Sequence, residues 1–317
     1  MRNAMLAVLL VGLFGCGGED DGTASDDSPF MFQSPQLWSA WSEPVPVNEL
    51  NSSFSDANPS LSKDGKTVYF NSDRTGTFGG NDLWVAHRKK KNGPWETPLN
   101  LGSVINTASN EAGPSLSENG LLLFFVSNRT GGFGDADLYV SRRTDPSDDF
   151  GWGAPENLGS AVNTEGADQA PHFQLLGEGG QPSLYFHKGT PPDLYAVPMS
   201  DDGAALGPAV ALAELNSTAQ DAGACVSRKG LELFFHSTRP GGFGAFDLYS
   251  STRASVNDPW SAPQNLGAPP NSTDSAVGDF GPAISFDGRT LMFTRALSGA
   301  FDIWMTTRTP LDDEEDE

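Results

Sequence analysis

The sequence predicts an all-β protein whose body is a single five-bladed β-propeller with four-stranded blades. Two observations predict this fold: three short phrases recur five times each in the same order, and the composition favours short strands joined by tight turns. Of 317 residues, 36 are glycine and 23 are proline, while charged residues make up only 19%. Such a composition is typical of strand-and-turn proteins rather than helical ones.

The repeated phrases define the blades, because self-similarity at a fixed period is the signature of repeat architectures. The phrase Trp-x-x-Pro begins at Trp41, Trp95, Trp152 and Trp260, with a degenerate copy at residues 206–208. An acid followed three residues later by proline begins at Asp56, Glu111, Asp168 and Asp279, and Asp221 heads a copy with alanine in place of the proline. The phrase Asp-(Leu/Ile)-aromatic begins at Asp82, Asp137, Asp193, Asp247 and Asp302.

Each repeat contains four predicted strands, which in the first copy are residues 59–62, 67–71, 83–87 and 96–101. These runs are β-branched or aromatic and are separated by turn residues such as Asp64-Gly65. Residues 38–309 divide into five units of about 54 residues, and such units bury their faces only when arranged radially.

The two ends of the repeat region predict how the ring closes. The region begins with the fourth-strand phrase at Trp41 and ends after the third-strand phrase at Asp302. We therefore expect the N-terminal strand to complete the last blade, which leaves no long free edge.

The first 37 residues indicate export and lipid attachment. Arg2 precedes an apolar run from Ala4 to Phe14 that is too short to span a bilayer, so residues 1–15 are interpreted as a signal peptide. The run ends in Leu-Phe-Gly-Cys, similar to the lipobox of bacterial lipoproteins, which makes Cys16 the expected lipidation site. An ordinary signal peptide with an incidental cysteine is the alternative. Residues 16–37 would form a flexible acidic tether and residues 310–317 an acidic tail.

Segments such as residues 59–74 (Pro-Ser-Leu-Ser-Lys-Asp-Gly-Lys-Thr-Val-Tyr-Phe-Asn-Ser-Asp-Arg) and Asp137-Leu-Tyr-Val resemble the WD40-like PD40 repeat of TolB-type propellers. The resemblance covers about 270 residues. It implies a lipoprotein of the bacterial envelope, anchored in the outer membrane and facing the periplasm or the cell surface, although TolB-type propellers have six blades.

The charge excludes nucleic acid as a partner. Residues 38–309 hold 30 acidic and 18 basic residues, and both tails are acidic, giving −22 for the whole chain. Such a surface repels phosphates.

Five acids occupy equivalent positions three residues before the predicted innermost strands: Asp56, Glu111, Asp168, Asp221 and Asp279. We expect them around one mouth of the central channel. Asparagines stand five residues earlier in four repeats (Asn51, Asn106, Asn163 and Asn216), and Asn271 stands eight residues before Asp279. Carboxylate and amide oxygens suit Ca²⁺ or Mg²⁺, so three interpretations stay open: hydrogen bonds within each loop, a bound cation such as Ca²⁺, or a basic group of a partner.

Three histidines break the repeat and are further candidates. His172 replaces Ser60 and Ser115, while His187 and His236 replace Asn71. No zinc-type spacing is present. Cys225 lies in a predicted strand and is expected to be a buried, inert thiol.

The longest shared phrase, Arg-(Thr/Pro)-Gly-(Thr/Gly)-Phe-Gly, joins the second and third strands at residues 74–79, 129–134 and 239–244. We expect its phenylalanine to cover the blade core and its arginine to pair with the nearby Asp82, Asp137 or Asp247. Repeats three and five shorten this connection, which breaks the symmetry of that face.

No nucleophile elbow, phosphate loop or dinucleotide fingerprint appears. The leading hypothesis is a non-catalytic envelope lipoprotein that binds a protein or a cell-wall or polysaccharide ligand. The alternative is a carbohydrate-active enzyme that uses acids at the channel mouth, because some five-bladed propellers are glycoside hydrolases, which need converging carboxylates. A purely structural spacer is the third hypothesis.

Overall fold

The computed structural model describes residues 37–175, 180–297 and 299–311. The predicted signal peptide, Cys16, almost all of the tether and most of the acidic tail lie outside the described residues. The described residues belong to one compact unit. None of the described residues forms a helix long and apolar enough to cross a membrane.

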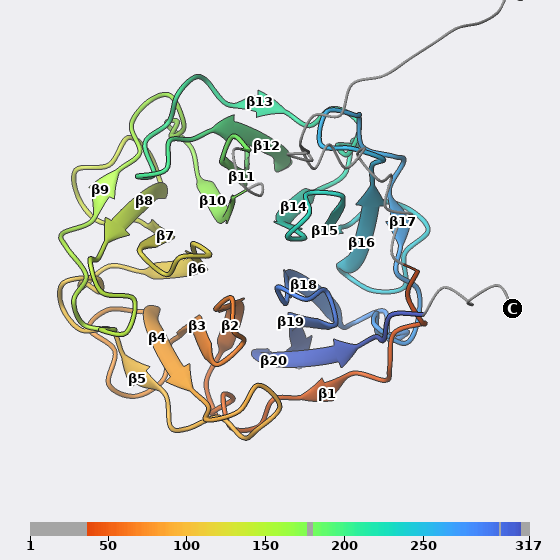
Figure 1. Cartoon of the computed structure of the whole chain (residues 1–317), viewed down its shortest axis with the longest axis horizontal. Coiled ribbons are helices and arrows are strands. Elements are labelled where there is room, and N and C mark those ends of the chain that lie inside the picture. The colour runs from red at the N-terminus through yellow and green to blue at the C-terminus, as the bar shows by residue number, and fades with distance from the viewer. Residues whose placement is uncertain (1–36, 176–179, 298, 312–317) are drawn as a thin grey trace, which may run out of the picture. The chain divides into compact units, whose positions relative to one another are not determined.

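The described chain forms five antiparallel four-stranded sheets arranged around a central axis (Figure 1). This confirms the predicted five-bladed β-propeller. In each of the first four blades the strands follow one another outward from the axis. Blade 1 contains β2 (Asp56–Leu61), β3 (Thr67–Ser72), β4 (Asp82–His87) and β5 (Leu99–Asn100). Blade 2 contains β6 (Glu111–Leu116), β7 (Leu122–Ser127), β8 (Asp137–Arg142) and β9 (Glu156–Asn157).

The remaining blades repeat the arrangement. Blade 3 contains β10 (Asp168–Gln174), β11 (Ser183–Lys188), β12 (Asp193–Pro198) and β13 (Val210–Ala211). Blade 4 contains β14 (Asp221–Val226), β15 (Glu232–Ser237), β16 (Asp247–Thr252) and β17 (Gln264–Asn265). Blade 5 contains β18 (Gly278–Ile284), β19 (Thr290–Leu297), β20 (Ala300–Thr307) and, as its outer strand, β1 (Val45–Pro46).

The pairing of β1 with β20 confirms that the N-terminal strand closes the ring. Val45 lies opposite Met305 and Pro46 opposite Trp304. Contacts continue beyond the strands, since Trp38 bridges Pro310 and the amide of Leu311 donates to the carbonyl of Leu37. The first and last described residues therefore lie together.

The cores of the blades are made by the apolar second strands. β7 is buried along its whole length, and Phe124, Phe125, Phe234 and Phe235 are fully inaccessible to solvent. Their side chains alternate between the two faces of each sheet, so that each blade packs against both neighbours.

The innermost strands begin earlier than expected, at or just before the acid rather than at the position of the proline. The reason is a β-bulge: in every inner strand the pairing register shifts after the residue that follows the acid. The next residue has positive φ; these residues are Asn58, Gly113, Ala170, Gly223 and Gly281. A bulge bends the strand locally and turns its amide out of the ladder. The fourth strands are also shorter than expected, with only two paired residues each.

Candidate functional site

The five equivalent acids do not converge on the channel. Each lies at the start of an inner strand, with 0 or 1% of its surface exposed. Each accepts a hydrogen bond of 2.6–2.7 Å from a backbone amide in the loop that precedes its own strand. Among the described residues, no group of three or more histidine, cysteine or acidic side chains could hold a metal ion. The arrangement is therefore that of the first interpretation, in which each acid organises its own loop.

Arginines from the same blades neutralise four of these acids. Arg74 pairs with Asp56, Arg129 with Glu111, Arg239 with Asp221 and Arg295 with Asp279. Each arginine also donates to a backbone carbonyl in the loop that enters its blade; these carbonyls belong to Leu50, Ile105, Leu215 and Pro270. A guanidinium can satisfy both acceptors because its donors are arranged as a planar fork.

The expected pairing of Arg74, Arg129 and Arg239 with Asp82, Asp137 and Asp247 is therefore wrong. Asp82 instead accepts from the amide of Phe78 and from the side chain of Asn100. The Asp56 and Asp82 carboxylates are both fully buried, so burial alone does not select the partner. On the inner side the Arg74 guanidinium also donates to the Ser72 hydroxyl and to the Leu50 carbonyl, and its planar fork serves all of these acceptors.

Blades 3 and 5 lack the arginine-containing loop that joins the second and third strands in the other blades. A basic residue stands instead on the second strand, opposite the buried acid. Arg295 and Lys188 occupy the ladder position that Ser72 holds in blade 1. Arg295 reaches Asp279, but the Lys188 ammonium donates to the carbonyl of Val162, 3.4 Å away. Asp168 Oδ1 has no hydrogen-bond partner among the described residues. Burial raises the pKa of Asp168, and the nearby carboxylate of Asp137 adds to this shift.

The asparagines connect each blade to the next and do not point oxygens at a shared site. Asn106 accepts from the amide of Leu83 and donates to its carbonyl, with distances of 2.8 and 3.0 Å. Asn51, Asn163, Asn216 and Asn271 make the same two bonds to Ile303, Leu138, Leu194 and Leu248. Each asparagine side chain thus makes the two hydrogen bonds that a further backbone residue of the short outer strand would make to the third strand.

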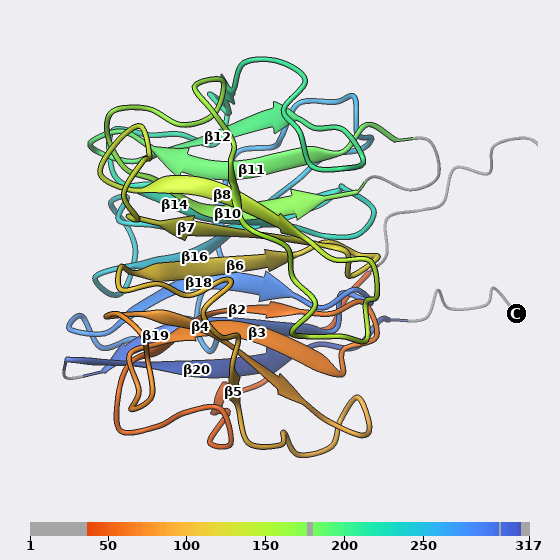
Figure 2. The same ribbon diagram turned by 90° about the vertical axis from the view of Figure 1, so that its left-hand side faces the viewer.

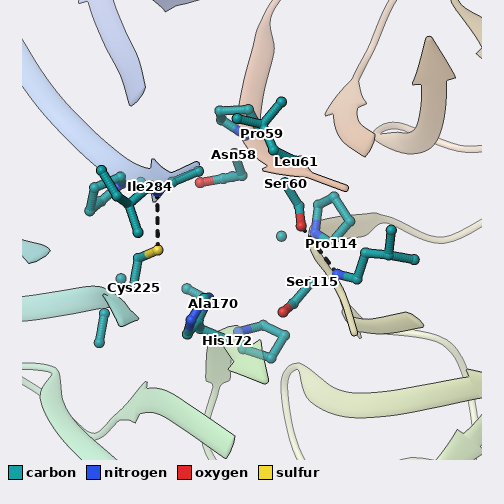
Figure 3. A pocket seen from close by; sticks show the side chains of 18 residues that line it. Asn58, Pro59, Ser60, Leu61, Pro114, Ser115, Ala170, His172, Cys225 and Ile284 are labelled. Carbon is teal, nitrogen blue, oxygen red and sulfur yellow. Dashed lines mark hydrogen bonds between the residues drawn. The ribbon is translucent and has the colours of Figure 1, made fainter. Parts of the chain in front are cut away.

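The central channel is narrow and is lined by the five inner strands (Figure 3). Its cavity volume is about 80 Å³, and no described residue that lines it carries a carboxylate. Ser60, Ser115, His172 and Cys225 occupy equivalent positions on its wall. The two serine hydroxyls and the Cys225 thiol accept hydrogen bonds from backbone amides of the next blade. His172 Nε2 donates a hydrogen bond to the Val226 carbonyl. These side chains join neighbouring blades.

Cys225 is a free cysteine and is 3% exposed, which confirms the expected buried thiol. Burial raises its pKa to about 12. The thiolate, which is the reactive form, is therefore essentially absent at neutral pH.

His187 and His236 accept the amides that the bulges turn outward. His187 Nδ1 accepts from Gly223 at 3.3 Å, and His236 Nδ1 accepts from Gly281 at 3.4 Å. Asn71 and Thr294 do the same for Gly113 and Asn58. Each imidazole must be neutral at Nδ1 to accept this bond.

Acid is expected to destabilise the protein through these histidines. Loss of solvation lowers the pKa of His187 to about 4 and that of His236 to about 3, whereas both are near 6.5 in the unfolded chain. The unfolded state therefore binds more protons below pH 6.5. Stability present above pH 6.5 is lost as pH falls toward 4, by on the order of 1 kcal/mol per pH unit for each histidine.

Urea unfolding between pH 7 and pH 5 measures this effect. The double variant His187→Asn, His236→Asn keeps an acceptor, as Asn71 does in blade 1, and should lose a large part of the pH dependence. The remainder belongs to His172, because burial lowers the pKa of this histidine to about 4 as well. An unchanged slope in the double variant would contradict the assignment.

The phenylalanines of the three long loops do not cover the blade core. Phe78, Phe133 and Phe243 are 52, 52 and 42% exposed. Their backbone amides donate to the buried carboxylates of Asp82, Asp137 and Asp247. This fixes the loop and directs the ring to solvent. The sequence shows that the Arg-(Thr/Pro)-Gly-(Thr/Gly)-Phe-Gly phrase is repeated. The direction of its phenylalanine ring depends on which acid the arginine contacts and which acid the phenylalanine amide contacts.

The comparisons with known proteins support the propeller fold and do not show a family. No protein-family model matches this chain, and no curated protein sequence matches it. Among solved structures, a thermostable family-43 glycoside hydrolase is 12% identical, with a TM-score of 0.56, over 86% of this chain and 94% of that one. The catalytic domain of the GH62 α-L-arabinofuranosidase of Coprinopsis cinerea is 15% identical, with a TM-score of 0.57, over 85% and 97% of the two chains. TolB from Acinetobacter baumannii is 15% identical, with a TM-score of 0.49, over 82% of this chain and 56% of TolB.

Proposed function

We propose that this protein is a non-catalytic binding module of the bacterial cell envelope, anchored through acyl groups on Cys16, that takes a protein, cell-wall or polysaccharide ligand. The observation that carries the proposal is the use of the acids. All five inner-strand acids are buried and serve their own loops, and four are paired with arginine. A glycosidase needs two carboxyl groups that flank a substrate bond at a solvent-accessible site.

The solved structures of similar fold include glycoside hydrolases, which makes an enzyme the competing function. The likeness is at 12–15% identity and extends to the fold. Function resides in sites placed on a fold rather than in the fold itself. The described channel wall offers no carboxylate to a sugar.

The proposal is tested by incubating the full-length protein with arabinoxylan, arabinan, xylan and peptidoglycan, with and without EDTA. We expect ligand retention without release of reducing ends. Release of reducing ends that is lost in Asp168→Ala or Asp279→Ala would overturn the proposal in favour of a hydrolase.

Anchoring has its own test. Radiolabelled palmitate should enter the wild-type protein in bacterial cells but not the Cys16→Ser variant. Labelling of both proteins, or of neither, would remove the lipoprotein part of the proposal.

A further inference from the structure

The alternating strand directions divide the connections between two faces of the propeller. Figure 2 shows the strands crossing from one face to the other. Because neighbouring strands are antiparallel, the connections between second and third strands lie on the same face as the connections between blades. We call this the Phe face. The hairpins between first and second strands and the connections between third and fourth strands lie on the opposite face.

Exposed phenylalanines are concentrated on the Phe face. Of the six phenylalanines with more than 40% exposure among the described residues, only Phe150 lies in a connection on the opposite face. The other five are Phe54, Phe78, Phe133, Phe243 and Phe301. Contact with a partner on this face would remove these rings from water, which is favourable for apolar surface.

The loops that carry three of these rings are held by backbone contacts. In addition to the bond from each phenylalanine amide to a buried aspartate, the glycine after the phenylalanine is wedged against the next inter-blade loop. A Cβ at Gly79 would lie 1.8 Å from the carbonyl oxygen of Ser109, and one at Gly244 would lie 2.1 Å from that of Val277. A loop backbone held in place before binding loses little conformational entropy when a partner arrives.

The Phe face is also strongly acidic. Its connections carry six exposed acids: Glu49, Asp73, Asp135, Glu165, Glu214 and Asp274. The bases in the described part of these connections, Arg74, Arg129 and Arg239, are each paired with a buried acid. The described lysines other than Lys188 lie on the opposite face, five of them (Lys63, Lys66, Lys89, Lys90 and Lys91) in blade 1.

We propose that the Phe face docks a protein segment that carries both lysine or arginine and apolar side chains. This rests on the proposed function, since it names the partner class of a binding module. Cationic side chains complement the exposed carboxylates and stack on exposed aromatic rings. The apolar side chains of the partner cover the phenylalanines and remove them from water. A polyanion would be repelled, and a neutral glycan would leave the carboxylates uncompensated.

The test uses the detergent-solubilised full-length protein and three synthetic peptides of equal length, with alternating lysine and leucine, glutamate and leucine, or lysine and serine. Calorimetry should detect binding of the lysine–leucine peptide, weakening as salt is raised. The triple variant Phe78→Ala, Phe133→Ala, Phe243→Ala should bind about tenfold more weakly or worse. The matched control is Leu99→Ala, Leu206→Ala, Val210→Ala, which removes exposed apolar groups from two outer strands and from a connection on the opposite face and should bind as the wild type does.

Three results would overturn the inference: equal binding of the glutamate–leucine peptide, equal binding of the lysine–serine peptide, or unchanged affinity in the phenylalanine variant. Xylohexaose that bound in place of the peptide, unchanged in length, would also overturn it while the proposed function stood. Xylohexaose that was shortened would instead overturn the proposed function. If the wild-type protein self-associated and the phenylalanine variant did not, the Phe face would bind the opposite face of a second copy. That result would overturn the inference of a separate partner.

Discussion

Replacing Arg239 with alanine is expected to lower the free energy of unfolding by about 3–5 kcal/mol, because it leaves a buried charge without a partner. The Asp221 carboxylate is 0% exposed and is the ion-pair partner of Arg239. The same change removes a donor from the carbonyl of Leu215. Urea unfolding at pH 7 measures the loss.

Two variants make this result specific. Arg142→Ala breaks an ion pair with Glu156, whose side chain is 68% exposed, and should cost less than about 1 kcal/mol. The double variant Arg239→Met, Asp221→Asn should lose less stability than Arg239→Ala alone, because no charge stays buried. If the double variant were the less stable of the two, the cost would lie in packing rather than in the uncompensated carboxylate.

Removal of the closing strand is expected to have the second large effect. A chain that begins at residue 52 lacks β1 and the fully buried Leu50, and it loses both bonds between Asn51 and Ile303. Burial of each large apolar side chain contributes about 1.5–3 kcal/mol, and the outer edge of β20 would be open to pairing with other chains. We expect this chain to aggregate or to melt without cooperativity.

A chain that begins at residue 37 is the control, since it keeps every described contact of the N-terminal strand, including the stacking of Arg308 on Trp41. Size-exclusion chromatography and circular dichroism melting compare the two chains. A monomer with an unchanged cooperative transition in the chain that begins at residue 52 would show that the fifth blade does not need β1.

The repeat was sufficient to predict the blade number, the strand order and the closure. Trp41 at one end and Asp302 at the other belong to different strands of one blade, so only ring closure completes the set. The positions of His172, His187 and His236 were also predicted correctly relative to Ser60 and Asn71, because pairing register preserves sequence spacing in repeats.

The role of the equivalent acids could not be predicted from spacing. The expectation that five carboxylates surround the channel mouth depends on an inner strand that begins at the proline. The bulge at Asn58 and its counterparts extends the strand to the acid, and this places the carboxylate under its own loop. A positive φ at an asparagine or alanine leaves no mark in a hydrophobic pattern.

The sequence by itself determined the architecture of this protein, because strand periodicity and turn residues act locally and the same local solution occurs five times. Only the tertiary structure decided the chemistry of its surfaces. Arg74 pairs with Asp56 rather than with Asp82, which is nearer in sequence, although both carboxylates are fully buried. The same guanidinium also reaches the Leu50 carbonyl, which lies beside Asp56. Asp82 is thereby left to hold the amide of Phe78, and the ring turns outward. Which donors reach each buried carboxylate depends on how strands and loops are placed in space, and the distance along the sequence does not record that placement.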